Sequence, residues 1–342
     1  MKLSTTLSAS GNPKDTVALA HDLDAAGIDA LWVAEVYSFD AVSILGYLAA
    51  RTERTQLGTG IAALYSRTPT LTAMTAAGLD AVSDGRFVLG LGSSGPQVIE
   101  GWHGVRYDHP IERTREIVEI CRSVWRREPL VHDGTYYRIP LPAGEGTGLG
   151  KPLKLINRPE RADIPIYVAA LGKRNLQLTA EIADGWMPHL FHPDRAEVWS
   201  ADLEAGFARR PDTLGPLEIV ADVSVAIGDG AEEALAHARQ RAALYVGGMG
   251  AKGSNFYNDL FRRYGYAEQA ETIQDLYLGG RREEAEAAVP DDFLAATTLV
   301  GDEGQVRERI EAYGAAGVTC LDLDLVGPDP VATFDTLRGW TT

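Results

Sequence analysis

The segment from Gly90 to Gly95, GLGSSG, ends a run of apolar residues and has the spacing of a dinucleotide-binding fingerprint. In that fingerprint the glycines let the backbone approach a pyrophosphate, and the segment opens a helix. Pro96, Gly101 and Gly104 would interrupt such a helix, and no strand ending in an acid follows about 20 residues later. We therefore predict no Rossmann site here, but a loop whose small residues allow a flat ligand to lie close to the backbone.

Few other residues could carry out nucleophilic or metal chemistry. The motifs HxH and HExxH are absent, and Cys121 and Cys320 are isolated, so we predict neither a metal site nor a disulfide. Ser93 and Ser94 have no recognisable His and Asp partners, which disfavours acyl transfer through a serine nucleophile. A site made of glycine, serine and alanine suits a large planar cofactor that supplies its own chemistry.

Short apolar runs alternate with helical patterns along the chain, and these elements must position the candidate residues. Strands are predicted at 2–8, 30–34, 55–62, 87–91, 164–170, 185–188, 217–226 and 317–325. Helices are predicted at 13–26, 40–50, 70–82, 111–126, 173–183, 193–208, 231–245 and 330–337. Eight strand-then-helix units with nearly continuous apolar strands predict an α/β fold, a (β/α)8 TIM barrel formed by residues 1–342 as one domain.

Two long stretches interrupt this repeat. The insertion 128–163 precedes the fifth strand and contains a glycine-rich run, whereas the insertion 247–300 precedes the eighth strand and is rich in aromatic and charged residues. Loops of this length in a compact domain are usually functional or mobile. Each insertion therefore either has a function of its own, or contacts another subunit or decorates the periphery of the barrel.

In a barrel of this kind the functional residues lie at the carboxyl ends of the strands and in the loops that follow. The hydroxyl and ionisable residues at those positions are Ser8, Ser10, Glu35, Ser93, Ser94, His103, Lys173, His189, Asp322 and Asp324. His103 lies between Gly101 and Gly104, and the flanking glycines would allow its ring to turn over the barrel mouth. We take Glu35 and His103 as candidate catalytic residues, although either could be structural.

The charge balance excludes several classes of partner. Asp and Glu number 48 against 32 Lys and Arg, which gives a net charge of −16. Such an acidic chain is poorly suited to nucleic acid or to anionic membranes, both of which require a basic patch. No uncharged run reaches the ~18 residues of a membrane span, and the first ten residues do not resemble a signal peptide. We expect a cytoplasmic protein that acts on a small molecule, as a homodimer.

Four stretches of the sequence resemble a known family. They are 31–35 (LWVAE), 80–92 (DAVSDGRFVLGLG), 101–115 (GWHGVRYDHPIERTR) and 164–186 (IPIYVAALGKRNLQLTAEIADGW). In their order and sequence they look like the luciferase-like monooxygenase superfamily, and most like its branch that uses the 8-hydroxy-5-deazaflavin coenzyme F420. The resemblance covers essentially the whole barrel.

This resemblance implies a cofactor site at the ends of strands three to five. It implies a cis peptide bond between Gly60 and Ile61 that backs the deazaflavin ring. The segment Gly92, Ser93, Ser94 and Gly95 would contact the ring and the ribityl chain, and Ala170, Leu171 and Gly172 would bind the phosphate. Independently, Gly172 opens a predicted helix whose first N–H groups would attract a phosphate. Lys173 either adds a cation there or is a solvated helix residue.

One position departs from the family pattern. Several relatives have an acid followed by His at the end of strand two, whereas this chain has Glu35 followed by Val36. Val cannot transfer a proton, so the mechanism of the His-bearing relatives should not be carried over. Gly95 stands where some relatives have an acid. Glu35 remains the candidate carboxylate near the cofactor, or else it orders the backbone at a strand end; His189 is expected near the cofactor tail.

The implied function is hydride transfer between C5 of coenzyme F420 and a small organic substrate that the sequence does not identify. The alternative is an FMN-dependent monooxygenase of the same superfamily, in which reduced flavin reacts with O₂. A third possibility is a barrel without catalytic activity that only binds a cofactor or a partner.

Overall fold

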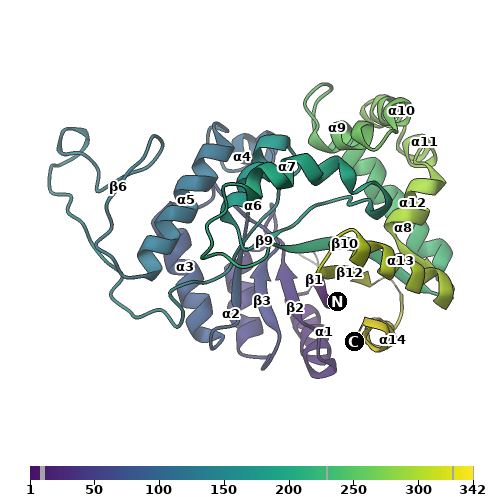
Figure 1. Cartoon of the computed structure of the whole chain (residues 1–342), viewed down its shortest axis with the longest axis horizontal. Helices are drawn as coiled ribbons and strands as arrows, with labels where there is room; N and C mark the ends of the chain where they lie inside the picture. The colour runs from purple at the N-terminus through teal and green to yellow at the C-terminus, as the bar shows by residue number, and fades with distance from the viewer. Residues whose placement is uncertain (8–11, 229, 326, 342) are drawn as a thin grey trace.

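Eight parallel strand positions close into a barrel in the computed structural model, which describes residues 1–7, 12–228, 230–325 and 327–341 (Figure 1). They are β1 (Lys2–Leu7), β2 (Ala30–Val33), β3 (Gln56–Thr59) continued by β4 (Ala62–Ala63), β5 (Phe87–Gly92), β8 (Ile166–Val168), β9 (Gly185–Trp186), β10 (Glu218–Ile227) and β12 (Cys320–Leu325). β10 pairs with both β9 and β12, and β12 pairs with β1, so the ring is complete. The predicted TIM barrel is confirmed.

The helices surround this barrel in the predicted order. They are α1 (Pro13–Ala26), α2 (Ala41–Ala49), α3 (Pro69–Val82), α5 (Pro110–Trp125), α6 (Lys173–Ile182), α7 (Glu197–Phe207), α8 (Ala231–Ala243) and α14 (Pro330–Thr341). Two helix starts follow from local sequence: Asp40 accepts a hydrogen bond from the Ser43 N–H at 3.0 Å, and Thr68 accepts one from the Leu71 N–H at 3.3 Å. Capping of this kind satisfies N–H groups that have no partner inside the helix. Within the described ranges, no helix is both long and apolar enough to span a bilayer.

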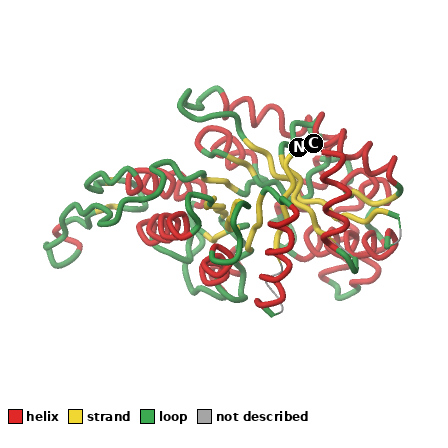
Figure 2. Tube along the Cα trace, turned by 90° about the horizontal axis from the view of Figure 1, so that it is seen from below, coloured by secondary structure: helices red, strands yellow, loops and turns green. Residues whose placement is uncertain are grey.

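The first insertion forms an arm, residues 128–163, that extends away from the barrel beside α5 (Figures 1 and 2). It contains the short antiparallel pair β6 (His132–Asp133) and β7 (Arg138–Ile139), followed by a 3₁₀ turn at Ala143–Glu145. The arm therefore has backbone pairing of its own, although most of it is irregular.

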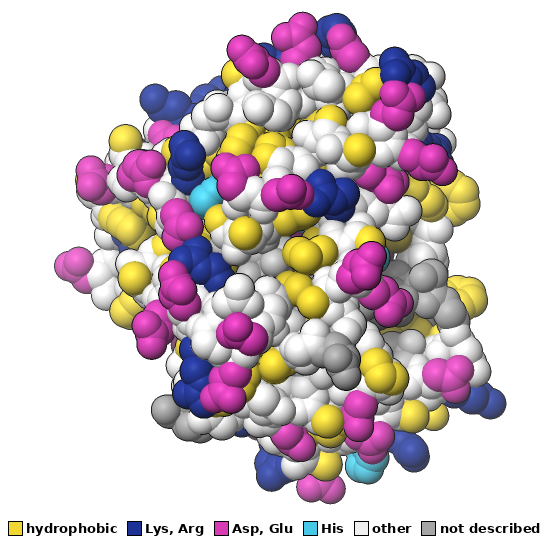
Figure 3. All heavy atoms as spheres, turned by 90° about the vertical axis from the view of Figure 1, so that its right-hand side faces the viewer, with side chains coloured by type: hydrophobic (Ala, Val, Ile, Leu, Met, Phe, Trp, Pro, Cys, Tyr) yellow, Lys and Arg dark blue, Asp and Glu magenta, His cyan; other side chains and the backbone are white. Residues whose placement is uncertain are grey.

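The second insertion packs as a group of helices against α8. After the π-helical turn at Leu244–Gly248 it contains α9 (Phe256–Arg263), α10 (Ala267–Leu278), α11 (Arg282–Ala287) and α12 (Asp291–Thr297). The short strand β11 (Leu299–Gly301) then pairs with β10, and α13 (Glu303–Ala315) follows. Figure 3 shows this side of the molecule, where acidic side chains are spread among basic ones.

Helix α13 was not among the elements predicted from the sequence. This helix begins with a capping box, in which Asp302 accepts from the Gln305 N–H at 2.9 Å and Gln305 accepts from the Asp302 N–H at 2.9 Å. The spacing of Asp302 and Gln305 is therefore a local signal for a helix start. It was not used when the eight strand-then-helix units were predicted.

Large side chains fill the barrel interior below its carboxyl end. Trp32 is fully buried among Val88, Tyr167, Val220 and Cys320. A β-carbon added at Gly58 would lie 2.3 Å from the Trp32 ring, and one added at Gly60 would lie 2.9 Å from the Trp32 β-carbon. Gly58 and Gly60 thus make room for the Trp32 indole, which fills the barrel interior below the carboxyl ends of the strands.

Candidate active site

A one-residue bulge interrupts the barrel wall at the end of β3. Gly58 pairs with Val88 and Ala62 pairs with Leu91, so four positions on one strand span three on the other. The peptide bond between Gly60 and Ile61 lies in this bulge and is cis, as the family resemblance implied.

The glycines of the GLGSSG segment fit against this bulge. A β-carbon at Gly90 would lie 1.8 Å from the Thr59 carbonyl oxygen, and one at Gly92 would lie 2.8 Å from the Ile61 side chain. Thr59 also bonds both backbone groups of Gly90 through its hydroxyl, at 2.9 and 2.7 Å. Glycine is therefore required at position 90 because two backbones approach closely, and at position 92 because the Ile61 side chain fills the space. This is a structural reason for a motif that resembled a dinucleotide fingerprint.

The loop after β5 forms one side of the barrel mouth. Ser93, Ser94 and Gly95 are half-buried, and Ser94 has a left-handed backbone with a φ of 56°. Gly95 precedes the short helix α4 (Pro96–Gly101). Beyond it, Trp102 packs against Tyr37 from the loop after β2, with ring centroids 6.2 Å apart, and both residues are about two-thirds exposed.

His103 follows this aromatic pair and is half-buried. The Tyr37–Trp102 contact places the loops after β2 and β5 beside each other, so the rim of the mouth is apolar and aromatic on this side. A catalytic role for His103 stays a prediction.

The start of α6 offers unpaired backbone donors. Gly172 is its N-cap residue and provides no side-chain hydrogen bond, and no other described side chain accepts from the first N–H groups of α6. A β-carbon at Gly172 would meet nothing within 4 Å, whereas Ala170 is buried and Lys173 is exposed. A helix N-terminus of this type attracts an anionic group such as a phosphate.

The second insertion supplies a cation beside this loop. Arg263 at the end of α9 donates from Nη1 to the Leu171 carbonyl at 3.4 Å, and its guanidinium lies 4.6 Å from the centre of the Trp199 ring. The position of Arg263 next to the predicted phosphate loop depends on how the insertion folds back.

Glu35 at the end of β2 is held in a bidentate ion pair. Its two oxygens accept from Arg67 Nη1 and Nη2 at 2.6 Å each, and Oε1 also accepts from the Ala41 N–H at 3.3 Å. The Glu35 side chain is 9% exposed. Burial opposes its charge, but the hydrogen bonds and charge of Arg67 outweigh this and lower its pKa below the ordinary value. Glu35 is therefore ionised at neutral pH, and Arg67 is the partner that sequence analysis missed.

A second network of charges lies on the opposite wall. His189, after β9, has Nδ1 3.0 Å from Asp222 of β10, and Asp222 accepts from Arg241 of α8 at 2.8 Å. Arg241 also donates to Asp324 of β12 at 2.8 Å. Burial would raise the pKa of Asp222, but His189 and Arg241 outweigh it, so the pKa lies well below the usual range. The Nε2 atom of His189 is buried and has no partner among the described residues, while its ring lies 4.0 Å from that of Tyr245.

Asp322 of β12 is a second buried carboxyl group, and its pKa is shifted in the opposite direction to that of Asp222. It accepts hydrogen bonds from the hydroxyls of Ser4 at 3.0 Å and Thr6 at 2.7 Å, and it is 8% exposed. Because side chains alternate along a strand, Asp322 faces the interior like Cys320, one step nearer the carboxyl end. Burial, followed in part by the neighbouring charge of Asp222, raises the pKa of Asp322 to about 6. Its carboxyl group can therefore exchange a proton near neutral pH.

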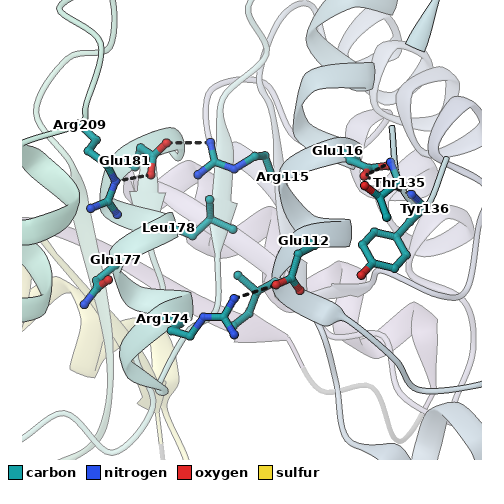
Figure 4. A pocket seen from close by; sticks show the side chains of 11 residues that line it. Glu112, Arg115, Glu116, Thr135, Tyr136, Arg174, Gln177, Leu178, Glu181 and Arg209 are labelled. Carbon is teal, nitrogen blue, oxygen red and sulfur yellow. Dashed lines mark hydrogen bonds and ion pairs between the residues drawn. The ribbon is translucent and has the colours of Figure 1, made fainter. Parts of the chain in front are cut away.

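A cavity of about 410 Å³ lies elsewhere, between α5, α6 and the base of the arm (Figure 4). Its charged residues pair with one another: Arg115 and Arg209 both bond Glu181, and Arg174 bonds Glu112. Since these groups satisfy each other and the cavity is outside the barrel mouth, we do not take it as the active site.

The described structure thus brings most of the predicted residues to one end of the barrel. Ser8 and Ser10 lie outside the described residues. Among the described residues, no group of three or more His, Cys, Asp and Glu is arranged to hold a metal ion.

These features define a (β/α)8 barrel whose candidate ligand site lies at the carboxyl ends of its strands, between a cis-peptide bulge and an uncapped helix start. The model of the luciferase-like monooxygenase family matches residues 1–320, and the chain belongs to this family.

Two relatives match over most of their length. A Mycobacterium tuberculosis protein, provisionally named a coenzyme F420-dependent oxidoreductase, is 44% identical over 314 residues, which cover 91% of this chain and 89% of that protein. A 5,10-methylenetetrahydromethanopterin reductase of Archaeoglobus fulgidus is 30% identical over 321 residues, covering 92% and 89%. The structure of the coenzyme F420-dependent tetrahydromethanopterin reductase from Methanopyrus kandleri superposes with a TM-score of 0.80 at 23% identity, covering 98% of this chain and 96% of that one, which shows the same fold.

Proposed function

We propose that this protein is a coenzyme F420-dependent oxidoreductase that transfers a hydride between the cofactor and a small organic substrate. The observation that carries the proposal is the 44% identity, over 91% of the chain, to a relative provisionally named as such an enzyme. Family membership alone would leave flavin chemistry equally open, because one barrel fold hosts many reactions.

The residues present fit a planar cofactor that carries a phosphate. The bulge at Gly60 and Ile61, with Gly92 to Gly95 beside it, places small residues and exposed backbone beside the expected cofactor ring. The uncapped N-terminus of α6 would hold the phosphate through the N–H groups that follow Ala170, Leu171 and Gly172, and Lys173 lies in the same turn. The Nε2 atom of His189 is buried and has no hydrogen-bond partner in the described ranges, so it is free to bond to the cofactor tail.

When bound, coenzyme F420 supplies a carbon that accepts or donates the hydride. The chain itself positions the ligand, excludes water from it and handles the accompanying proton. Glu35 is ionised and held by Arg67, so its part would be electrostatic, since a group of this kind does not donate a proton near neutral pH. Val36 at the next position has no proton to transfer.

We propose Asp322 as the group that donates the proton accompanying hydride transfer. Asp222 and Asp322 are neighbouring carboxyl groups whose surroundings shift their pKa values in opposite directions, an arrangement that separates an acid from a permanent charge. Asp322 has hydroxyl partners on β1 and no ion pair among the described residues. Below about pH 6 it therefore holds a proton that Asp222 has lost. In the reducing direction its carboxyl group would give this proton to the substrate as the hydride arrives.

The test is a pair of binding titrations of the purified chain, one with coenzyme F420 and one with FMN, followed by the change in cofactor absorbance. We expect coenzyme F420 to bind at least tenfold more tightly. Tighter binding of FMN, together with oxygen consumption on reduction, would assign the chain to the flavin monooxygenases instead. Tight F420 binding without turnover of any carbonyl or alkene substrate would favour a barrel without catalytic activity.

A further inference from the structure

Large apolar side chains stay exposed on one side of the barrel mouth. Tyr37 and Trp102, which contact each other across two loops, are 67% and 66% exposed. Val36 and Phe39, on the same loop as Tyr37, are 48% and 62% exposed. Single exposed apolar residues are ordinary, but a group of them beside a candidate ligand site is typical of a surface that binds an apolar molecule.

The aromatic pair lies on either side of the strand that carries the cis-peptide bulge. In the barrel wall β3 is the strand between β2 and β5. Tyr37 follows β2, Trp102 follows β5, and the bulge at Gly60 and Ile61 ends β3. The two rings therefore meet between the loops that flank the expected cofactor ring, and a substrate that reaches this ring has to pass them.

The backbone on both sides of the pair is held in place. Glu35 accepts from the Ala41 N–H at 3.3 Å, which ties the loop after β2 to α2. On the other side, the Trp102 N–H donates to the Val98 carbonyl at 2.9 Å at the end of α4. Aromatic side chains on a fixed backbone lose little conformational entropy when they bind, because each has only two torsions to restrict.

The charges around the pair already have partners. Residues 34–40 and 93–109, which form the two loops, contain four acids and one Arg, so the balance of charge disfavours an anionic ligand. Arg106 lies 3.8 Å from Asp108. Each acid accepts from a protein group, namely Arg67 for Glu35, the Ser43 N–H for Asp40, the Tyr107 N–H for Glu100 and Arg113 for Asp108. In the described structure, therefore, these acids are engaged elsewhere and do not single out a cation.

We infer that the substrate carries a flat, uncharged and mainly apolar ring that stacks on Tyr37 and Trp102, while its reducible C=O or C=C group extends toward the bulge. The reducible group rests on the proposed function, whereas the contact with the ring does not. A flat ring fits because aromatic faces and edges attract one another beyond the area that they bury. Tyr37 and Trp102 are then specificity-determining residues for the reaction.

The test measures the binding of defined enones to the full chain by calorimetry, with and without coenzyme F420. The probes are benzylideneacetone, its cyclohexyl analogue, and two benzylideneacetones with a carboxylate or a trimethylammonium group on the ring. We expect benzylideneacetone to bind at least fivefold more tightly than each of the other three. Trp102→Ala should weaken its binding at least tenfold and remove the preference over the cyclohexyl analogue, whereas Tyr37→Phe, which keeps the ring, should stay within twofold of the wild type.

The matched control is Phe207→Ala, which removes an exposed aromatic ring at the end of α7 and should change none of these affinities. All the altered side chains are exposed, so circular dichroism should be unchanged. Equal affinity for benzylideneacetone in the wild type and Trp102→Ala, tighter binding of a charged probe, or an effect of Trp102→Ala on self-association alone would overturn the inference. Binding of benzylideneacetone that depends on Trp102, in a chain that does not bind coenzyme F420, would refute the proposed function and support the aromatic site.

Discussion

Asp222 and Asp322 occupy the same register on the neighbouring strands β10 and β12, yet within the described part of the chain only Asp222 has ion-pair partners. His189 and Arg241 hold the charge of Asp222, whereas Asp322 has the hydroxyls of Ser4 and Thr6. The barrel wall therefore places a permanent negative charge beside a carboxyl group that titrates near pH 6. Both carboxyl groups lie two residues beyond Val220 and Cys320, which pack in the core around Trp32.

The first prediction concerns the pH dependence of turnover. If Asp322 donates a proton during substrate reduction, kcat/KM of the wild type should fall as pH rises through about 6, where this carboxyl group loses its proton. Asp322→Asn should lower kcat by ~10²–10⁴-fold, the usual range for a general acid, and abolish that limb of the profile. An Asn variant that retains the limb would remove Asp322 from the mechanism.

The second prediction uses the same group without any cofactor. The pKa of Asp322 is higher in the folded than in the unfolded chain, so its contribution to stability is present at pH 4 and is lost as pH rises through about 6. Relative to Asp322→Asn, the wild type should lose up to about 3 kcal/mol of unfolding free energy between pH 4 and 7. Urea unfolding of both proteins at four pH values measures this, and parallel curves would contradict it.

The third prediction concerns the ion pair at the end of β2. Glu35→Gln leaves the guanidinium of Arg67 partly buried without a counter-charge, which should cost about 3 kcal/mol at pH 7. The pKa of Glu35 is lowered on folding, so the loss should be present above pH 4.5 and should shrink as pH falls through the folded-state pKa. Thermal or urea unfolding at pH 7 and pH 3 gives the comparison.

The double variant Glu35→Gln, Arg67→Met separates the structural role of this pair from a role toward the cofactor. Replacing both partners should restore most of the stability. If Glu35 also acts on the cofactor, affinity for coenzyme F420 or turnover should stay at least tenfold below the wild type. Full recovery of both would show that Glu35 only orders the strand end.

The fourth prediction tests the phosphate seat at α6. Gly172→Val adds a branched side chain at a position with no described atom within 4 Å and with an ordinary backbone conformation, so the fold should tolerate it. The side chain would occupy the space a phosphate needs, and the dissociation constant for coenzyme F420 should rise more than tenfold. Gly215→Val, at an equally open position near the opposite end of the barrel, is the control. Equal affinities in the two variants would place the phosphate elsewhere.

The sequence alone was sufficient to predict the barrel, whereas the position of the site stays a prediction. Eight buried strands alternating with helices allow few other folds, and helix starts at Asp40 and Thr68 depend on side chains three residues from their partners. The cis bond at Gly60–Ile61 followed from the family resemblance. The glycines of the segment 90–95 beside it were recognisable in the sequence by their spacing.

The tertiary structure decided which charged groups act together. Glu35 meets Arg67 from 32 positions later, Ser224 bonds Asp324 from 100 positions away, and Arg263 reaches the Leu171 carbonyl from an insertion. Such contacts have no local signal, because strand closure and the return of the second insertion bring their partners together. Burial and counter-charge determine whether a carboxyl group is an acid or a fixed charge, so the different states of Asp222 and Asp322 exist only in the closed barrel.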